Sequence, residues 1–197
     1  MTKTLYLMRH GQTLFNKRHR IQGWCDAPLT DLGVYQAQVA GQYFKNAGIT
    51  FDAAYSSTSE RACDTLEIVT NGSLPYQRVK GLKEWNFGTF EGESEDLNPP
   101  LPYEDFFVTY GGESQDQVRE RTAATILQLM QETKGKSVLM VSHGGAMANF
   151  ARAWKDNWQL DELGHMTNCG ILKFTFGHDQ FYLEEVIGHD FSGWEEK

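Results

Sequence analysis

Short apolar segments alternate with amphipathic helical segments along most of this 197-residue chain. Buried strands are predicted where apolar runs are bounded by polar or glycine residues, at residues 3–9, 51–56, 76–79, 137–142, 169–176 and 181–187. Helices are predicted from apolar spacing and capping residues, at residues 30–47, 59–72, 114–132 and 144–155. This alternation predicts an α/β fold, a three-layer sandwich whose mostly parallel central sheet is flanked by helices. The last two strands are joined by a short turn, so we expect that pair to be antiparallel.

The segment after Glu84 breaks the alternation. Residues 84–113 contain several glycines, a proline cluster and an aromatic group. Long irregular segments inside compact domains are typically functional loops, so we expect a lid-like insertion at about residues 85–113. The chain length fits a single domain that covers residues 1–197.

The charge pattern restricts the class of ligand. A formal net charge of −8 disfavours nucleic acid, because that binding requires Lys and Arg to neutralise phosphates. Residues 1–20 contain five Lys or Arg and no acid, whereas residues 84–118 contain nine acids and no Lys or Arg. A small basic region in an acidic chain favours a small anionic ligand.

The apolar pattern and the cysteines indicate the cellular compartment of the protein. Its apolar runs are far too short for a membrane span, and the first nine residues are predicted to be a strand rather than a leader peptide. Cys25, Cys63 and Cys169 lie far apart and form no CxxC pair, which disfavours disulfides and zinc. We therefore expect a cytoplasmic protein without membrane association, either a monomer or a homodimer.

Two histidines follow predicted strands directly. Arg9-His10-Gly11 ends the first strand, and Ser142-His143-Gly144 ends a later one. In an open α/β sheet, ligands bind at the carboxyl ends of the strands. Imidazole is a nucleophile at neutral pH, a guanidinium binds phosphate oxygens, and a glycine-led helix N-terminus attracts anions. A loop histidine beside a surface arginine explains the first motif alone, and a capping turn with an incidental histidine explains the second. Two such motifs in one chain favour a functional site.

Two further residue types complete a phosphate-handling set. Arg61 lies in the first turn of a predicted helix, where its charge is unfavourable unless an anion compensates it. Glu84 lies among aromatic residues that would desolvate its carboxyl, as a general acid requires, and Glu91 is the alternative acid in that segment.

Together these segments resemble the histidine phosphatase superfamily, in its phosphoglycerate-mutase-like branch. The resemblance rests on ordered motifs between about residues 5 and 146, namely Arg9-His10-Gly11-Gln12-Thr13-x-x-Asn16, Gln22-Gly23-Trp24-x-Asp26, Ser56-Ser57, Arg61-Ala62-x-x-Thr65, Leu82-x-Glu84-x-x-Phe87-Gly88-x-x-Glu91-Gly92, Gly112-Glu113-Ser114 and Ser142-His143-Gly144. Motifs spaced in this order are specific, although each one alone is not.

The resemblance implies a role for each motif residue. It implies His10 as the phosphorylated nucleophile and Glu84 as the proton donor. It implies a phosphate clamp formed by Arg9, Arg61 and His143. Around the phosphate it places Thr13, Asn16, Gln22, Gly23 and Gly144.

The mechanism sets the protonation states and the partners of the site. A neutral His10 calls for a backbone acceptor on its other ring nitrogen, and a protonated His143 would strengthen the clamp. Neither a metal nor a cofactor is needed, and His19, His165, His178 and His189 have no metal-ligand spacing among themselves. The expected partner is a small phosphorylated metabolite.

The lid separates two enzyme activities. Glycolytic mutases of the family carry basic residues after the acid glutamate, including an arginine pair, whereas residues 85–118 here have none. We therefore expect a phosphatase for a small phosphate monoester. One alternative is a phosphoglycerate mutase that uses Lys17, Arg18 and Arg20 as its cations. Another is a non-catalytic protein that binds a phosphorylated ligand.

Overall fold

The computed structural model describes residues 2–160, 162–164 and 166–195. Within these residues a single sheet holds the strands β1 (Lys3–Arg9), β2 (Ala53–Ser56), β3 (Gln77–Arg78), β4 (Ser137–Ser142), β5 (Ile171–Gly177) and β6 (Gln180–Ile187). The α-helices are α1 (Leu14–Lys17), α2 (Asp31–Asn46), α3 (Glu60–Val69), α4 (Gln115–Glu132) and α5 (Gly144–Ala153). Short 3₁₀ helices occupy much of the remaining chain, at Lys80–Leu82, Gly88–Phe90, Glu95–Leu97, Phe106–Tyr110 and Lys155–Asn157.

The sheet is mixed, with the order β3-β2-β4-β1-β5-β6. β1 pairs with β4, β4 with β2, and β2 with β3, all in parallel. β5 is antiparallel to both β1 and β6. The prediction of a mostly parallel sheet with an antiparallel closing pair is therefore confirmed.

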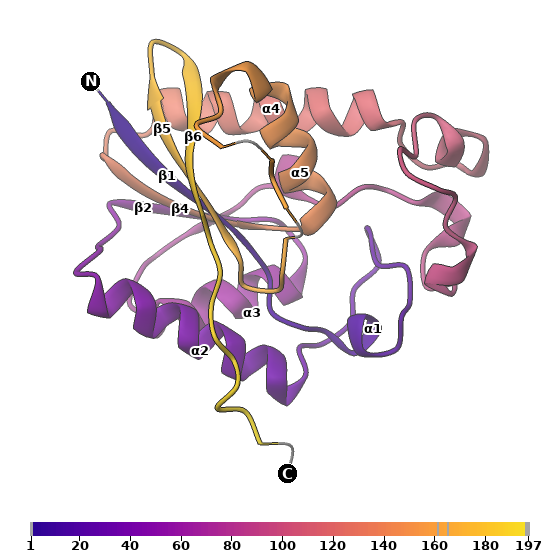
Figure 1. The fold of residues 1–197 in the computed structure, drawn as a ribbon, viewed down its shortest axis with the longest axis horizontal. Helices are drawn as coiled ribbons and strands as arrows, with labels where there is room; N and C mark the ends of the chain where they lie inside the picture. The colour runs from indigo at the N-terminus through magenta and orange to yellow at the C-terminus, as the bar shows by residue number, and fades with distance from the viewer. Residues whose placement is uncertain (1, 161, 165, 196–197) are drawn as a thin grey trace.

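Helices cover both faces of the sheet (Figure 1). Leu5 and Leu7 of β1 pack in a core cluster with residues of α4 and α5. The alternate residues Tyr6 and Met8 pack in another cluster with residues of α2 and α3. Because successive side chains of a strand point to opposite faces, this division confirms the predicted three-layer arrangement.

The predicted caps begin the helices as expected. The Thr30 side chain accepts a hydrogen bond from the Gly33 amide at the start of α2. Ser114 and Gln117 form a reciprocal capping box at the start of α4. The short helix α1 was not predicted, because four residues carry no apolar period, although Thr13 and Asn16 cap it in the same reciprocal way.

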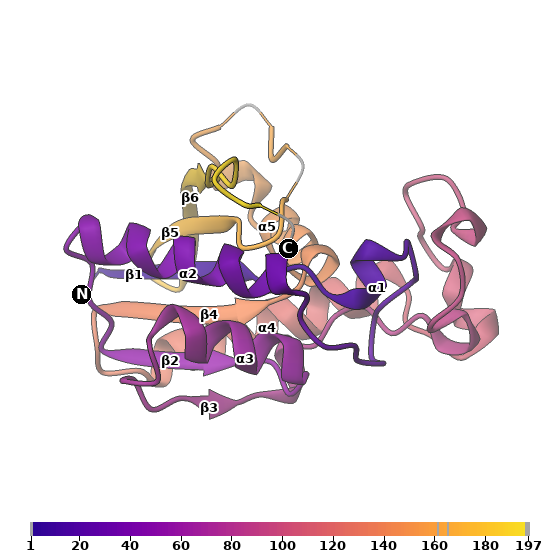
Figure 2. The same cartoon turned by 90° about the horizontal axis from the view of Figure 1, so that it is seen from below.

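The lid begins at Trp85 and extends beyond the end of the sheet (Figures 1 and 2). It consists of turns and three 3₁₀ helices, and its Trp85 and Phe107 form a small apolar cluster with Val118 of α4. Several apolar side chains remain exposed on it, with Leu101 reaching 77%. The predicted irregular insertion is confirmed, and it lies beside the ends of β1 and β4.

Candidate active site

The register of the sheet brings the two strand-end histidines together. Arg9 is the last residue of β1 and pairs with Ser142, the last residue of β4. The next residue of each strand is therefore a histidine at the same edge of the sheet. The ring centroids of His10 and His143 are 5.2 Å apart.

His10 is held as a neutral imidazole. Its ring is 4% exposed, and its Nδ1 lies 2.7 Å from the carbonyl oxygen of Gly11. A carbonyl only accepts, so Nδ1 carries the proton and Nε2 keeps its lone pair. Burial, followed by the charges of Arg61 and Arg9, lowers the pKa of His10 well below its usual value. This is the backbone acceptor that a nucleophilic His10 requires.

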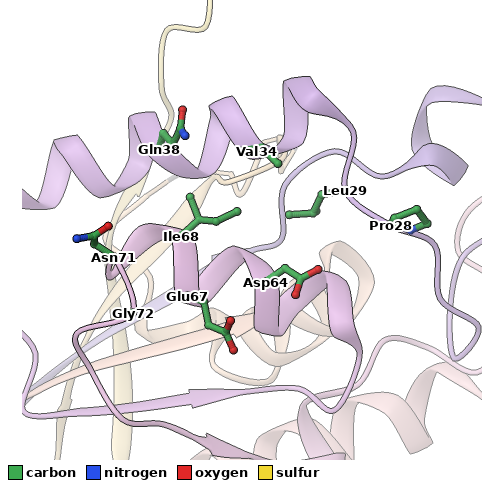
Figure 3. Close-up of a pocket in the computed structure, with 9 residues that line it drawn as sticks. All are labelled: Pro28, Leu29, Val34, Gln38, Asp64, Glu67, Ile68, Asn71 and Gly72. Carbon is green, nitrogen blue, oxygen red and sulfur yellow. The ribbon is translucent and has the colours of Figure 1, made fainter.

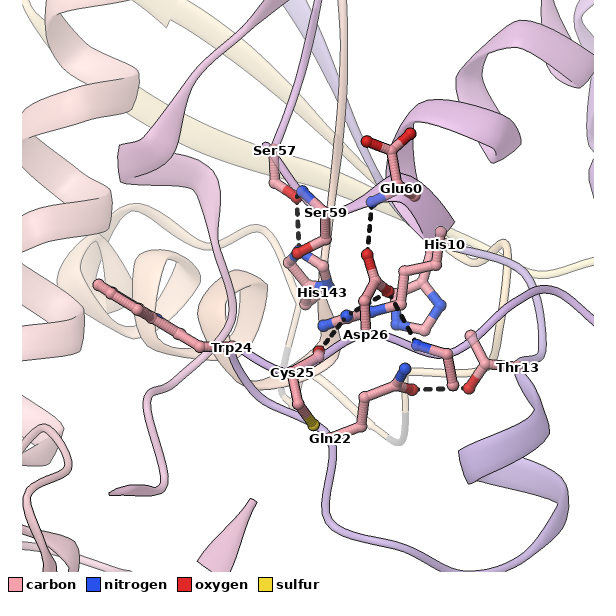
Figure 4. A network of polar contacts seen from close by, with 12 residues as sticks. His10, Thr13, Gln22, Trp24, Cys25, Asp26, Ser57, Ser59, Glu60 and His143 are labelled. Carbon is pink, nitrogen blue, oxygen red and sulfur yellow. Dashed lines mark hydrogen bonds and ion pairs between the residues drawn. The ribbon is translucent and has the colours of Figure 1, made fainter. Parts of the chain in front are cut away.

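His143 is fully buried, and its ring is oriented by Ser57 (Figure 4). Its Nε2 lies 2.7 Å from Ser57 Oγ, and that oxygen already accepts the amide proton of Ser59. A serine hydroxyl both donates and accepts, and where it donates to Nε2 the proton of a neutral ring lies on Nδ1.

The expectation of a protonated His143 is not met. Burial lowers the pKa of His143 well below its usual value, and the nearby Arg61, His10 and Arg9 lower it further. A neutral ring still presents the Nδ1 proton as a hydrogen-bond donor. Sequence reasoning overlooked the desolvation of this side chain, which lies near the charges of Arg61 and Arg9.

Arg61 is 1% exposed and is held by the loop that follows Gln22. Its Nη2 donates to the carbonyl of Gly23 at 2.8 Å, and its Nη1 donates to the carbonyl of Cys25 at 2.9 Å. Asp26 Oδ1 completes the set with an ion pair to Nη1 at 2.9 Å. Nη1 and Nη2 of Arg61 are therefore bonded to protein groups, whereas Nε has no partner among the described residues.

Three buried ring and guanidinium nitrogens of the predicted site have no protein partner in the described ranges. In the described part of the chain, Arg9 Nε, Arg61 Nε and His143 Nδ1 form no hydrogen bond to another protein group. Buried polar groups are almost always paired, and leaving one unpaired costs about 1–3 kcal/mol. Three such donors around His10 are suited to an anion with several oxygens.

Glu84 reaches the same region from the start of the lid. It is 8% exposed, and its carboxylate accepts hydrogen bonds from the amides of Trp85, Gly145 and Ala146 at 2.7 to 2.9 Å. The last two amides belong to the first turn of α5. A Cβ on Gly145 would lie 2.7 Å from Glu84 Oε1, so this approach requires glycine.

Glu91, the alternative acid, is engaged elsewhere. Its two oxygens accept from the backbone amides of Gly23, Trp24, Cys25 and Phe87 at 2.6 to 3.1 Å. The carboxylate therefore ties the lid to the loop that holds Arg61. Of these two candidate acids, Glu84 lines the cavity and Glu91 does not.

Two positioning residues escaped sequence reasoning. Arg121 of α4 donates to the carbonyls of Gly81, Lys83 and Glu84 and forms an ion pair with Glu113 at 2.7 Å. The Trp24 indole also donates to the carbonyl of Glu84, at 2.9 Å. Nothing in the local sequence distinguishes Arg121 from a solvated helix residue.

The cavity above His10 has a volume of about 690 Å³. Its lining includes six of the predicted residues, namely Arg9, His10, Asn16, Gln22, Glu84 and Gly144. Arg61 and His143 are buried beneath them. The lid forms another wall, which includes Trp85, Leu101 and Tyr103.

Thr13 and Gly23, the other two predicted pocket residues, do not line the cavity but contact other predicted site residues. Thr13 is buried and donates its hydroxyl proton to Gln22 Oε1 at 2.6 Å, which directs the Gln22 amide (Figure 4). The Gly23 amide donates to Glu91 while its carbonyl accepts from Arg61. Thr13 therefore orients Gln22, and Gly23 orients Arg61.

The cations of the mutase alternative are only partly in place. Of Lys17, Arg18 and Arg20, Arg20 lines the cavity, and α5 adds Arg152, which sequence reasoning did not consider.

Asn168 was also missed by sequence reasoning. Its Nδ2 donates to the carbonyl of His10 at 3.1 Å.

The described residues contain no group of three or more His, Cys, Asp or Glu side chains placed to hold a metal ion. His165, one of the histidines without ligand spacing, lies outside the described residues. In the same part of the chain no helix is both long and apolar enough to cross a membrane.

A second cavity of about 600 Å³ lies between α2 and α3 (Figure 3). Val34 and Gln38 of α2 face Asp64, Glu67 and Ile68 of α3 across it. No predicted site residue lines it.

Comparisons with known proteins identify a family. Residues 5–187 match the Histidine phosphatase superfamily (branch 1). The chain is 30% identical to a 2,3-bisphosphoglycerate-dependent phosphoglycerate mutase of Parvibaculum lavamentivorans, covering 83% of this chain and 82% of the relative. It is also 30% identical to an acid phosphatase of Mycobacterium tuberculosis, covering 94% and 93%. The crystal structure of a phosphoglycerate mutase from Bacillus anthracis superposes with a TM-score of 0.81 at 29% identity, covering 93% and 92%. The chain belongs to the histidine phosphatase superfamily.

Proposed function

We propose that this protein is a phosphatase that hydrolyses a small phosphate monoester through a phosphohistidine on His10. The observation that carries the proposal is the set of unpaired buried donors around a neutral His10, on Arg9, Arg61 and His143. Phosphoryl transfer spreads charge over three equatorial oxygens, and donors already in position stabilise that charge.

In the first half-reaction, His10 Nε2 attacks the phosphorus and forms an N–P bond while the P–O bond to the leaving group breaks. Glu84, in its protonated form, gives its proton to the leaving alkoxide. The donors on Arg9, Arg61 and His143 bind the oxygens of the group in transfer. The product alcohol leaves, and His10 carries the phosphoryl group.

In the second half-reaction, water attacks the phosphorus and the N–P bond breaks. Glu84, as the carboxylate, takes a proton from that water, which restores both residues and releases phosphate. The carboxylate of Glu84 accepts three hydrogen bonds from backbone amides. These hydrogen bonds support this step, because they hold the proton acceptor at one place in the cavity.

The lid supports hydrolysis over isomerisation. A mutase must retain a phosphorylated, acidic intermediate while it reorients, and this lid contributes acids and aromatics but no Lys or Arg. The acid phosphatase relative shows that the superfamily supports hydrolysis in a chain of similar length. We further propose that the enzyme works in the cytoplasm as one domain without a metal or cofactor, as a monomer or homodimer.

Phosphate release from p-nitrophenyl phosphate and from 3-phosphoglycerate tests the proposal. Phosphate release without isomerisation is expected, together with a phosphoprotein that is labile in acid and absent from His10→Ala. Substantial turnover by His10→Ala would overturn the nucleophile assignment.

A phosphoglycerate mutase is the second candidate, favoured by the positions of Arg20 and Arg152 in the cavity. Conversion of 3-phosphoglycerate into 2-phosphoglycerate, faster than phosphate release, would establish it. A chain that binds phosphate esters but turns none over would instead be a phospho-ligand-binding protein.

A further inference from the structure

A row of α5 residues continues from the phosphate region into the rest of the cavity. Gly145, whose amide binds Glu84, lies in the first turn of α5, and Ala148, Asn149 and Arg152 follow it along the same wall. Residues spaced by three and four share one face of a helix. This face of α5 therefore forms one wall of the cavity.

Asn149 is the unusual member of this row. Its side chain is 1% exposed, and its Nδ2 donates to the carbonyl of Gly145 at 2.9 Å. That bond fixes the orientation of the amide, because only the NH₂ group can donate to a carbonyl. Within the described residues, Asn149 Oδ1 accepts no hydrogen bond.

The lid contributes a second oxygen of this kind. Asn98 lines the same cavity, and its buried Oδ1 also lacks a partner among the described residues. The neighbouring lining is apolar, with Leu101, Pro102 and Tyr103. Buried acceptors are almost always paired, so these two oxygens are suited to hydrogen-bond donors of a ligand.

We infer that Asn149 Oδ1 forms a leaving-group subsite that selects phosphate esters bearing a hydroxyl or ammonium donor close to the ester oxygen. This inference rests on the phosphatase activity proposed above. From Gly145 to Asn149 the helix rises about 6 Å, which matches a two-carbon chain plus one hydrogen bond. The substrate class is the phosphorylated polyols and amino alcohols, and a plain alkyl ester leaves Oδ1 unpaired.

Three esters that differ in one terminal group test the subsite directly. They are n-propyl phosphate, 2-hydroxyethyl phosphate and 2-aminoethyl phosphate, which end in methyl, hydroxyl and ammonium. We expect kcat/KM of the native protein to be at least about tenfold higher for one of the donor esters than for the propyl ester, the change that one ordinary hydrogen bond gives. The leading ester identifies the donor as hydroxyl or ammonium.

If Asn149 Oδ1 is the acceptor, the preference for a donor ester should disappear when this oxygen is removed. In Asn149→Leu the ratio between the donor ester and the propyl ester is expected to fall close to one, and Asn149→Ala repeats the test with a smaller side chain. Asn157→Leu is the matched control, because Asn157 lies outside the cavity lining, and it should keep the native ratio. No preference in the native protein, or a preference that survives in both Asn149 variants, would overturn the inference.

Binding separates this inference from the proposed function. Calorimetry with His10→Ala measures the affinity of the same esters without turnover. If the native protein hydrolyses all three esters equally and the variant binds them equally, the phosphatase stands and the subsite fails. If nothing is hydrolysed but the donor ester binds about tenfold tighter, the subsite stands and the phosphatase fails.

Discussion

The rings of His10 and His143 lie 5.2 Å apart because the ends of β1 and β4 are paired in register. Both are buried, and both lie near the positive charges of Arg9 and Arg61. Neither ring gains a proton easily in this setting. The pairing of β1 with β4 therefore places two neutral imidazoles side by side in a positively charged site.

This arrangement predicts a loss of stability in mild acid. Burial lowers the pKa of both histidines in the folded chain, whereas in the unfolded chain they titrate near 6.5. Below that pH the unfolded state binds more protons, so each histidine lowers the free energy of unfolding by up to about 1.4 kcal/mol per pH unit.

Urea unfolding at pH 7 and pH 5 measures the effect. The carboxylates also contribute, so the informative quantity is the difference between the native protein and a double variant, His10→Gln with His143→Gln. The double variant should lose less stability between the two pH values. An equal loss in both proteins would contradict the buried neutral state.

Glu84→Gln removes the acid of the proposed mechanism. We expect hydrolysis of an alkyl phosphate to slow by about 10²–10⁴-fold, because an alkoxide is a poor leaving group without protonation. Hydrolysis of p-nitrophenyl phosphate should slow less, since nitrophenolate leaves without a proton. Steady-state rates on the two esters give the ratio.

The control for this prediction is Glu104→Gln, which changes an exposed lid carboxylate that does not line the cavity. It should leave both rates close to native. Equal slowing of both esters by Glu84→Gln would point to a role for Glu84 outside proton transfer.

Arg61→Lys should weaken the binding of inorganic phosphate by about tenfold or more. Lysine is a point charge on a flexible stem and does not reproduce the fork that bonds the carbonyls of Gly23 and Cys25. Asp26→Asn should cause a smaller loss, because one ion pair of that set is removed. Inhibition constants for phosphate provide the measurement.

Arg78→Lys is the matched control for Arg61→Lys. Arg78 pairs with Glu60 on the exposed surface, where an ion pair contributes little. Unchanged phosphate inhibition in Arg61→Lys, or an equal loss in Arg78→Lys, would show that Arg61 does not bind the anion.

Much of the fold follows from local patterns. The apolar segments of β1 and β4, the Thr30 cap and the Ser114 box are each defined by a few neighbouring residues. Because strands at the centre of a parallel sheet end at one edge, the meeting of His10 and His143 was also foreseeable. What local pattern did not define is the register, which decides the distance between the two rings.

The roles of the supporting residues could not be read from the sequence, although Ser57 and Asp26 stand in its motifs. Ser57, Asp26 and Arg121 act through partners that are distant in the chain, and serine, aspartate and arginine are ordinary surface residues. The charge of His143 was misjudged for the same reason, because its burial depends on tertiary packing. Asn149 gives no signal until its unpaired oxygen is seen.

Glu91 tests the coupling between the lid and the phosphate clamp. Its carboxylate accepts from four backbone amides, three of them in the loop that carries the carbonyl partners of Arg61. In Glu91→Gln one acceptor oxygen becomes an NH₂ group that faces amide donors. We expect the free energy of unfolding to fall by about 2–4 kcal/mol, since two or more charge-assisted bonds are lost.

If Glu91 has only a structural role, Glu91→Gln should lower the free energy of unfolding and leave phosphate binding unchanged. If Glu91 couples the lid to the phosphate clamp, phosphate binding should weaken as well. If Glu91 positions Arg61 through Gly23 and Cys25, the variant should also bind phosphate several-fold more weakly at temperatures where it is fully folded. Glu93→Gln, an exposed change two residues away, should alter neither property. Lower stability with native phosphate affinity in Glu91→Gln would confine Glu91 to holding the lid, and would leave Arg61 positioned by Asp26 and its own helix.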